Sequence, residues 1–231
     1  IVENTLKDII TAKKDALIEE TTVSPGAVTT GEIAIGLRQA LRLGLEKQVS
    51  KLAGTDGFFR NERVRITLPE TLCKLDSTLR NIGLGKSVDE GIRLLNRTAE
   101  RTVREAVPVL EDAVNGIAFI DANAVLLGND NAATEYMRKV TKDNLYNKLY
   151  PIVKSLLAET GAAGVWKNII DRCNDLPASI FPDVNPDLTG YVTHETLNGI
   201  YVMIAVEESA IRRYKDFRTT AVLRRVFALQ D

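Results

Sequence analysis

Apolar residues recur every three or four positions over almost the whole chain, and this spacing constrains the fold more than any other feature. Residues 2–20 show it along a strip broken only by Lys13. In residues 30–53 the strip consists of Ile33, Leu37, Leu41, Leu45, Val49 and Leu52. Such a strip lies on one face of an α-helix and has to be covered by other elements. The sequence therefore predicts an all-α protein.

Helix-start signals, glycines and prolines divide the chain into about eight or nine predicted helices. We place them near residues 2–20, 30–53, 68–82, 87–116, 121–127, 130–160, 163–176, 193–213 and 218–229. Pro108 and Pro151 fall inside two of these segments. Because proline donates no backbone hydrogen bond and crowds the preceding turn, we expect it to kink or divide both helices.

One short segment, near residues 57–68, is predicted to be extended. Val64, Ile66 and Leu68 alternate there with polar residues, as in a half-buried strand. Since no second strand is available to pair with it, we interpret this segment as a connector packed on the helices.

Particular residues mark the predicted helix ends. Three pairs have the spacing of a capping box, in which a hydroxyl and a carboxylate satisfy free backbone amides. These pairs are Thr29 with Glu32, Thr67 with Glu70, and Ser87 with Glu90. Glycines that end helices often adopt the left-handed conformation. We assign that role to Gly54, Gly83, Gly128 and Gly161.

The predicted domain organisation is simple. A Pro/Gly/Thr-rich linker, TTVSPGAVTT, follows the first helix. We therefore expect residues 1–28 to form an N-terminal helix and linker that docks loosely or exchanges with a neighbouring molecule. Residues 29–231 are predicted to form one multi-helix domain.

Composition fits this fold and excludes several classes of function. Of the 231 residues, 45% are hydrophobic and 26% are charged, which is ordinary for a chain with a buried core. The net charge of −1 gives no general attraction to nucleic acid or acidic membranes. The longest apolar run, residues 199–206, is too short to span a bilayer.

The stretch FPDVNPDLTGYVTHE carries the best candidate for a cation site. Asp183, Asn185 and Asp187 are spaced two residues apart, as at the start of a calcium loop. An EF-hand is excluded because Leu188 stands where its glycine is required, and His194 where its glutamate is required. A turn before a helix capped by Thr193 is the favoured interpretation, and a different calcium site is the alternative.

Other chemical motifs are incomplete. GLGKS at residues 83–87 resembles the end of a phosphate-binding loop, but Arg80 replaces the first glycine of that motif. His194 begins HETLN, and because the chain has one His, it cannot supply both histidines of a zinc-protease motif. Cys73 and Cys173 permit either one disulfide or two buried thiols, and spacing favours the thiols.

Charged and aromatic residues toward the C-terminus have ordinary structural interpretations. Glu207 and Glu208 precede Arg212 and Arg213 by about one helical turn, which predicts ion pairs rather than a catalytic pair of carboxylates. The basic segment IRRYKDFRTTAVLRR is interpreted as a solvated helix end with its aromatic and aliphatic side chains turned inward.

Five aromatic residues lie in apolar helical contexts: Tyr136, Tyr146, Tyr150, Trp166 and Tyr201. Packing in the core is the ordinary explanation for them. A cavity between helices that holds a hydrophobic molecule, such as a lipid or pigment, is the alternative. Spacing does not distinguish the two.

Three segments resemble the bacterial family catalogued as domain of unknown function 4197. They run from Asp56 to Glu100, from Gly128 to Val153 and from Asp187 to Arg212, and the likeness covers about residues 29–229. The resemblance implies a helical protein that is often exported, and hence a secreted or periplasmic location. It implies no activity, cofactor or catalytic residue. Asp130 and Thr193, which match the family pattern, are interpreted as helix caps.

These observations favour a non-enzymatic, exported protein that binds a hydrophobic small molecule between helices. The first alternative is a cation-dependent or oligomeric scaffold, based on Asp183, Asn185, Asp187 and the separate first helix. The second is a hydrolase that uses two facing carboxylates, one of them with a displaced pKa. No cofactor is predicted beyond calcium or the bound ligand.

Overall fold

A computed structural model describes residues 26–73, 75–175 and 187–231, and every regular element in them is helical. The all-α prediction is thus confirmed, while the predicted helix at residues 2–20 lies outside the described residues. The helices are α2 (Thr30–Gly44), a π-helix (Leu45–Val49), α3 (Ser50–Leu52), α4 (Glu70–Cys73), α5 (Asp76–Asn81), α6 (Gly85–Asn115), α7 (Ala122–Leu126), α8 (Ala132–Glu159), α9 (Ala162–Asn174), α10 (Leu188–Arg213) and α11 (Ala221–Phe227). Short 3-10 turns, Lys215–Phe217 and Ala228–Gln230, follow α10 and α11.

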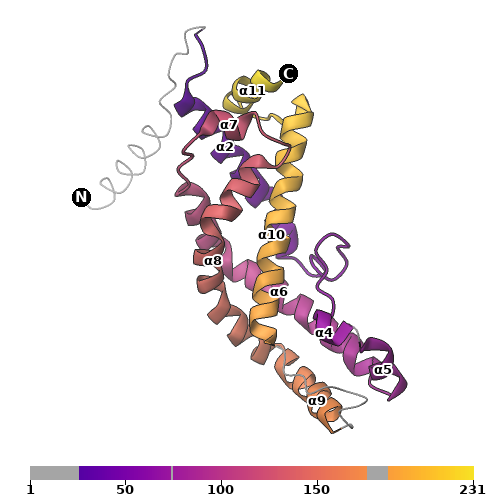
Figure 1. The fold of residues 1–231 in the computed structure, drawn as a ribbon. Helices are drawn as coiled ribbons and strands as arrows, with labels where there is room; N and C mark the ends of the chain where they lie inside the picture. The colour runs from indigo at the N-terminus through magenta and orange to yellow at the C-terminus, as the bar shows by residue number, and fades with distance from the viewer. Residues whose placement is uncertain (1–25, 74, 176–186) are drawn as a thin grey trace, which may run out of the picture.

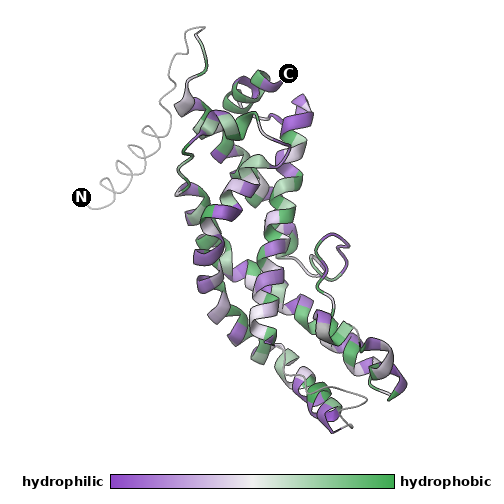
Figure 2. Ribbon diagram, viewed as in Figure 1, coloured by the Kyte–Doolittle hydropathy of each residue, from purple (hydrophilic) through white to green (hydrophobic). Residues whose placement is uncertain are grey.

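Three long helices form the body of the molecule. α8 packs along both α10 and α6, while α2 packs on α10 and α11 at the end that carries the C-terminus (Figure 1). α9 packs on α6 at the opposite end. Each long helix carries both apolar and polar turns (Figure 2), as expected for helices with one buried face. None of the described helices combines the length and the apolar character needed to cross a membrane.

The apolar strip predicted in residues 30–53 is buried along its whole length. All six of its side chains are at most 4% exposed. Each four-residue step turns about 40° past a full α-helical turn, so a strip with this spacing winds around a regular helix. The π-helix Leu45–Val49 widens one turn, which offsets part of this winding and keeps the strip facing the core.

The predicted helix ends are confirmed in part. Thr29 and Glu32 form the full capping box of α2. α6 instead begins at Gly85, two residues before Ser87, and Glu90 pairs with Arg93. α4 begins at Glu70 itself, so the helix predicted from residue 68 starts later and consists of two short pieces, α4 and α5.

Two of the four glycine caps are left-handed. Gly83 and Gly161 have φ angles of 89° and 79°, and in each case the backbone N–H of the glycine donates to a carbonyl three residues back. Gly54 and Gly128 do not have positive φ, so their predicted left-handed conformation is wrong.

The two internal prolines do not interrupt their helices. α6 continues through Pro108 and α8 through Pro151, so the predicted division does not occur. α8 bends along its length instead (Figure 1). A bend lets a helix continue past a proline that supplies no hydrogen bond.

Residues 57–68 form a packed connector without a strand, as predicted. Val64, Ile66 and Leu68 are buried, and the residues between them are exposed. Helix α6 holds both ends of the loop. Asn96 pairs its amide with both the N–H and the C=O of Ile66, at 2.9 and 2.8 Å, and Glu100 accepts from the N–H groups of Phe58 and Phe59.

Candidate functional site

The predicted cation site is described at only one of its three residues. Asp183 and Asn185 lie outside the described residues. Asp187 caps α10 by accepting a hydrogen bond of 2.8 Å from the N–H of Gly190. Within the described ranges, no group of three or more His, Cys, Asp or Glu side chains is placed to hold a metal ion.

The helix caps predicted at Thr193 and Asp130 are wrong. α10 begins five residues before Thr193, at Leu188, and Thr193 donates its hydroxyl proton to the carbonyl of Thr189 inside the helix. Asp130 does not cap α8, which begins after Asn131; its carboxylate pairs with Arg213.

Glu207 and Glu208 are both buried and each forms an ion pair, but only one of the two pairs is the predicted one. Glu208 contacts Arg212 at 2.8 Å, as expected from their spacing. Glu207 instead accepts from Lys47 and Gln48, which the π-helix carries, at 2.7 and 2.9 Å. These contacts give both carboxylates a structural role in holding α10 to neighbouring elements.

The two cysteines are free thiols. Cys173 is buried, and its burial raises the pKa of the thiol. Cys73 is exposed, so the interpretation of two buried thiols is right for Cys173 alone.

The basic segment after α10 is more ordered than a solvated helix end. Arg212 and Arg218 are buried and donate to backbone carbonyls. Leu223, Val226 and Phe227 turn inward as predicted. The inward orientation predicted for Tyr214 and Phe217 is wrong, because 58% and 41% of their surfaces are exposed.

The aromatic residues have two different environments. Trp166 is fully buried, and its ring lies so close to α6 that a Cβ atom on Gly91 would come within 2.9 Å of it. Core packing therefore explains Trp166. Tyr146 and Tyr201, in contrast, line a groove between α8 and α10.

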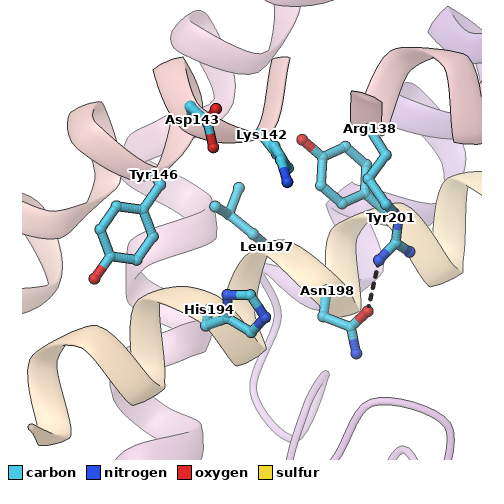
Figure 3. A pocket seen from close by; sticks show the side chains of 8 residues that line it. All are labelled: Arg138, Lys142, Asp143, Tyr146, His194, Leu197, Asn198 and Tyr201. Atoms are coloured by element: carbon cyan, nitrogen blue, oxygen red, sulfur yellow. Dashed lines mark hydrogen bonds between the residues drawn. The ribbon is translucent and has the colours of Figure 1, made fainter. Parts of the chain in front are cut away.

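This groove is the candidate site (Figure 3). It has a volume of about 160 Å³ and opens to solvent. α8 contributes one stripe of side chains at four-residue spacing, and α10 contributes two such stripes that face it. The lining residues are Arg138, Lys142, Asp143 and Tyr146 from α8, and His194, Leu197, Asn198 and Tyr201 from α10.

Hydrogen bonds fix the position of the buried ring of the groove. Thr141 donates its hydroxyl proton to the carbonyl of Met137. The contact of 2.9 Å between the hydroxyls of Thr141 and Tyr201 must therefore be donated by Tyr201. Burial raises the pKa of Tyr201, so the phenol stays neutral and the ring stays in place at physiological pH.

A cation lies on this ring. The guanidinium of Arg138 is 4.8 Å from the centre of the Tyr201 ring, within the range of a cation–π contact. Its Nη1 donates to Asn198 Oδ1 at 3.1 Å (Figure 3). Its Nε is buried and donates no hydrogen bond. The carboxylate of Glu135 forms an ion pair with this Nε at 3.7 Å, which is too long for a hydrogen bond.

Burial also raises the pKa of Tyr146, and the negative charge of Asp187 adds to this effect. The hydroxyl of Tyr146 lies beside Gly190, in the first turn of α10. The capped start of α10 therefore adjoins one end of the groove. Asp187, predicted from the sequence as a metal ligand, orders this turn and places its charge near the hydroxyl of Tyr146.

Two larger hollows do not resemble a binding cavity for a hydrophobic molecule. One, of about 680 Å³, lies between α9 and the start of α10, and the other, of about 600 Å³, lies beside α2. Both are open and mix charged with apolar side chains, including Lys154 and Lys167 in the first and Arg38 and Glu46 in the second.

Three of the lining residues, His194, Tyr146 and Tyr201, are singled out by the sequence. The other five are not: Arg138, Lys142, Asp143, Leu197 and Asn198. A signal for three of these exists in the four-residue spacing of Arg138, Lys142 and Tyr146, and of His194 and Asn198. Spacing shows that residues share a helix face, but which helix lies opposite depends on the tertiary fold.

Comparison with known proteins gives one match. Neither the curated proteins nor the solved structures contain a chain that matches this one. One family model matches residues 27–228, which is most of the chain. The chain therefore belongs to the family described as "Protein of unknown function (DUF4197)".

Proposed function

We propose that this chain is a non-enzymatic binding protein and that its ligand lies in the groove between α8 and α10. The observation that supports this most directly is the arrangement of Arg138 on the ring of Tyr201 beside an open hollow. Binding sites combine apolar walls with a few polar groups held in place. This groove has both, and contacts with Asn198 and Tyr201 hold Arg138 in place.

The size of the groove limits the ligand. A cavity of about 150 Å³ in another protein accommodates benzene, and this groove measures about 160 Å³. We therefore propose a ligand whose apolar part is a single ring, which is smaller than a lipid or pigment. The apolar surfaces available to it belong to Leu197, Tyr146 and Tyr201.

The contacts of the carboxylates favour binding over hydrolysis. A carboxyl group that acts as a general acid needs a raised pKa. In the described residues, hydrogen bonds from partner groups lower the pKa of five carboxylates. These are Glu32, Asp89, Glu90, Glu159 and Asp231. The cation-dependent scaffold has less support, because the Asp187 carboxylate is already engaged as the cap of α10.

The resemblance to often-exported proteins supports a secreted or periplasmic location for the binding protein.

The proposal is tested by NMR titration with benzyl alcohol, a neutral single-ring probe. We expect amide shifts confined to residues 138–146 and 194–201, with a dissociation constant of about 1 mM, as is usual for so small a ligand.

Two exposed lysines of α8 provide a matched pair of variants. Lys142 lines the groove, and Lys148 is exposed elsewhere on α8. Lys142→Trp places a bulky ring over the groove and should abolish the shifts, whereas Lys148→Trp should leave them unchanged. Absence of shifts in the wild type, or shifts that survive Lys142→Trp, would show that the groove is not the site.

A further inference from the structure

We propose that the ligand of the α8–α10 groove is an organic anion, a single-ring carboxylate whose charged group binds Arg138. This inference rests on the proposed function and adds the chemical class of the ligand. The geometry of Arg138, the charges that surround it and the shape of the groove each bear on it.

Arg138 is held in place with one donor to spare. Stacking on Tyr201 and the bond to Asn198 fix the plane of its guanidinium. Nε is buried and faces the Glu135 carboxylate at 3.7 Å, so it is closed to a ligand. Nη2 has no acceptor among the described residues, and it can donate a charge-assisted hydrogen bond to a carboxylate of the ligand.

Among the residues that line the groove, two cations face one anion. Arg138 and Lys142 are cationic, Asp143 is anionic, and His194 is the remaining titratable group at the rim apart from the tyrosines. Outside the lining, Glu135 forms an ion pair with Arg138 Nε at 3.7 Å, which balances the charges around the groove. An anion beside Arg138 would therefore be recognised by the free Nη2 donor, with Lys142 as the second cation of the lining, and not by an excess of charge.

The shape of the groove places a ring next to this charge. Leu197 and Tyr201 are 5% and 2% exposed, so they form a floor rather than a rim. Arg138 and Lys142 stand above that floor from the α8 side (Figure 3). A ring lying on Leu197 beside Tyr201 directs a carboxylate substituent toward Arg138.

The test compares three probes of one size by isothermal titration calorimetry: benzoate, benzyl alcohol and benzylammonium. A hydrogen bond to a charged group contributes about 1.5–3 kcal/mol. We therefore expect benzoate to bind at least about tenfold more tightly than benzyl alcohol, and benzylammonium no more tightly than benzyl alcohol. Added salt should weaken the binding of benzoate alone.

Arg138→Gln should bring benzoate to the affinity of benzyl alcohol, and Arg101→Gln is the matched control. Arg101 has 39% of its side chain exposed, against 33% for Arg138, and its partner Glu159 lies away from the groove. Lys142→Gln should reduce benzoate binding by a smaller factor. Because Lys142 is exposed, this variant provides a test even if Arg138→Gln fails to fold.

The outcomes separate this inference from the proposed function. Equal affinities for benzoate and benzyl alcohol in the wild type would overturn the anion and leave the groove as the site. Preference for benzylammonium would assign the charge recognition to Asp143 and also overturn it. If no probe binds, the proposed function fails as well.

Discussion

At the scale of single residues, Glu208 and Arg212 show how buried charges connect three helices. The Glu208 carboxylate accepts from the N–H groups of Ala133 and Thr134 at 2.9 and 2.7 Å. Arg212, paired with it, donates to the carbonyls of Leu126 and Val125 at the end of α7. α8 has no side-chain cap of its own at Asn131, so a carboxylate from α10 supplies the acceptors its first turn requires.

Glu208→Gln should therefore lower the free energy of unfolding by about 3 kcal/mol, because it leaves Arg212 buried without its counter-charge. Urea denaturation measures this change. The control is Glu159→Gln, which removes a carboxylate that is 52% exposed from its pair with Arg101 and should cost less than about 1 kcal/mol. Similar losses for the two variants would mean that Glu208 is not an essential cap.

At the scale of elements, the loop between α3 and α4 depends on α6 for its conformation. Asn96 and Glu100 lie one helical turn apart and hold the two ends of the loop. Between them the loop exposes Arg60, Arg63 and Arg65. Backbone hydrogen bonds within the loop order its part up to Arg65, and Asn96 supplies the partners for both backbone groups of Ile66 beyond it.

Asn96→Ala should release this loop, since it leaves the N–H and the C=O of Ile66 buried without partners. We expect faster tryptic cleavage after the loop arginines, detected by mass spectrometry, together with a lower melting temperature. Asn144→Ala, at an exposed position of α8, should change neither. Cleavage at the wild-type rate in Asn96→Ala would show that the loop is ordered by other contacts.

The helix ends show which local signals can be interpreted from sequence. Thr29 with Glu32 is a capping box in fact, because each side chain accepts a hydrogen bond from the backbone N–H of the other residue. Ser87 with Glu90 has the same spacing, but the preceding chain turns at Gly83 and starts α6 earlier, at Gly85. The spacing of Ser87 and Glu90 therefore does not show whether Ser87 caps α6 or lies inside it, because that depends on where the preceding turn ends.

At the scale of the whole molecule, the sequence predicts the fold class and the buried strip of residues 30–53 but not the site. The six apolar side chains of the strip from Ile33 to Leu52 are buried, as their helical spacing requires. The groove arises because α8 lies along α10 with Arg138 facing Tyr201, a pairing between residues far apart in the chain. Neither period nor motif specifies that pairing, which is why aromatic residues of the core and of the groove look alike in the sequence.

The proposed function depends on the groove between α8 and α10 being a ligand site. The most direct measurement is a crystal structure of the protein grown with benzoate. We predict a ring lying on Leu197 and Tyr201, with its carboxylate at hydrogen-bond distance from the Arg138 guanidinium. An empty groove at saturating benzoate, or benzoate bound only elsewhere, would contradict the account.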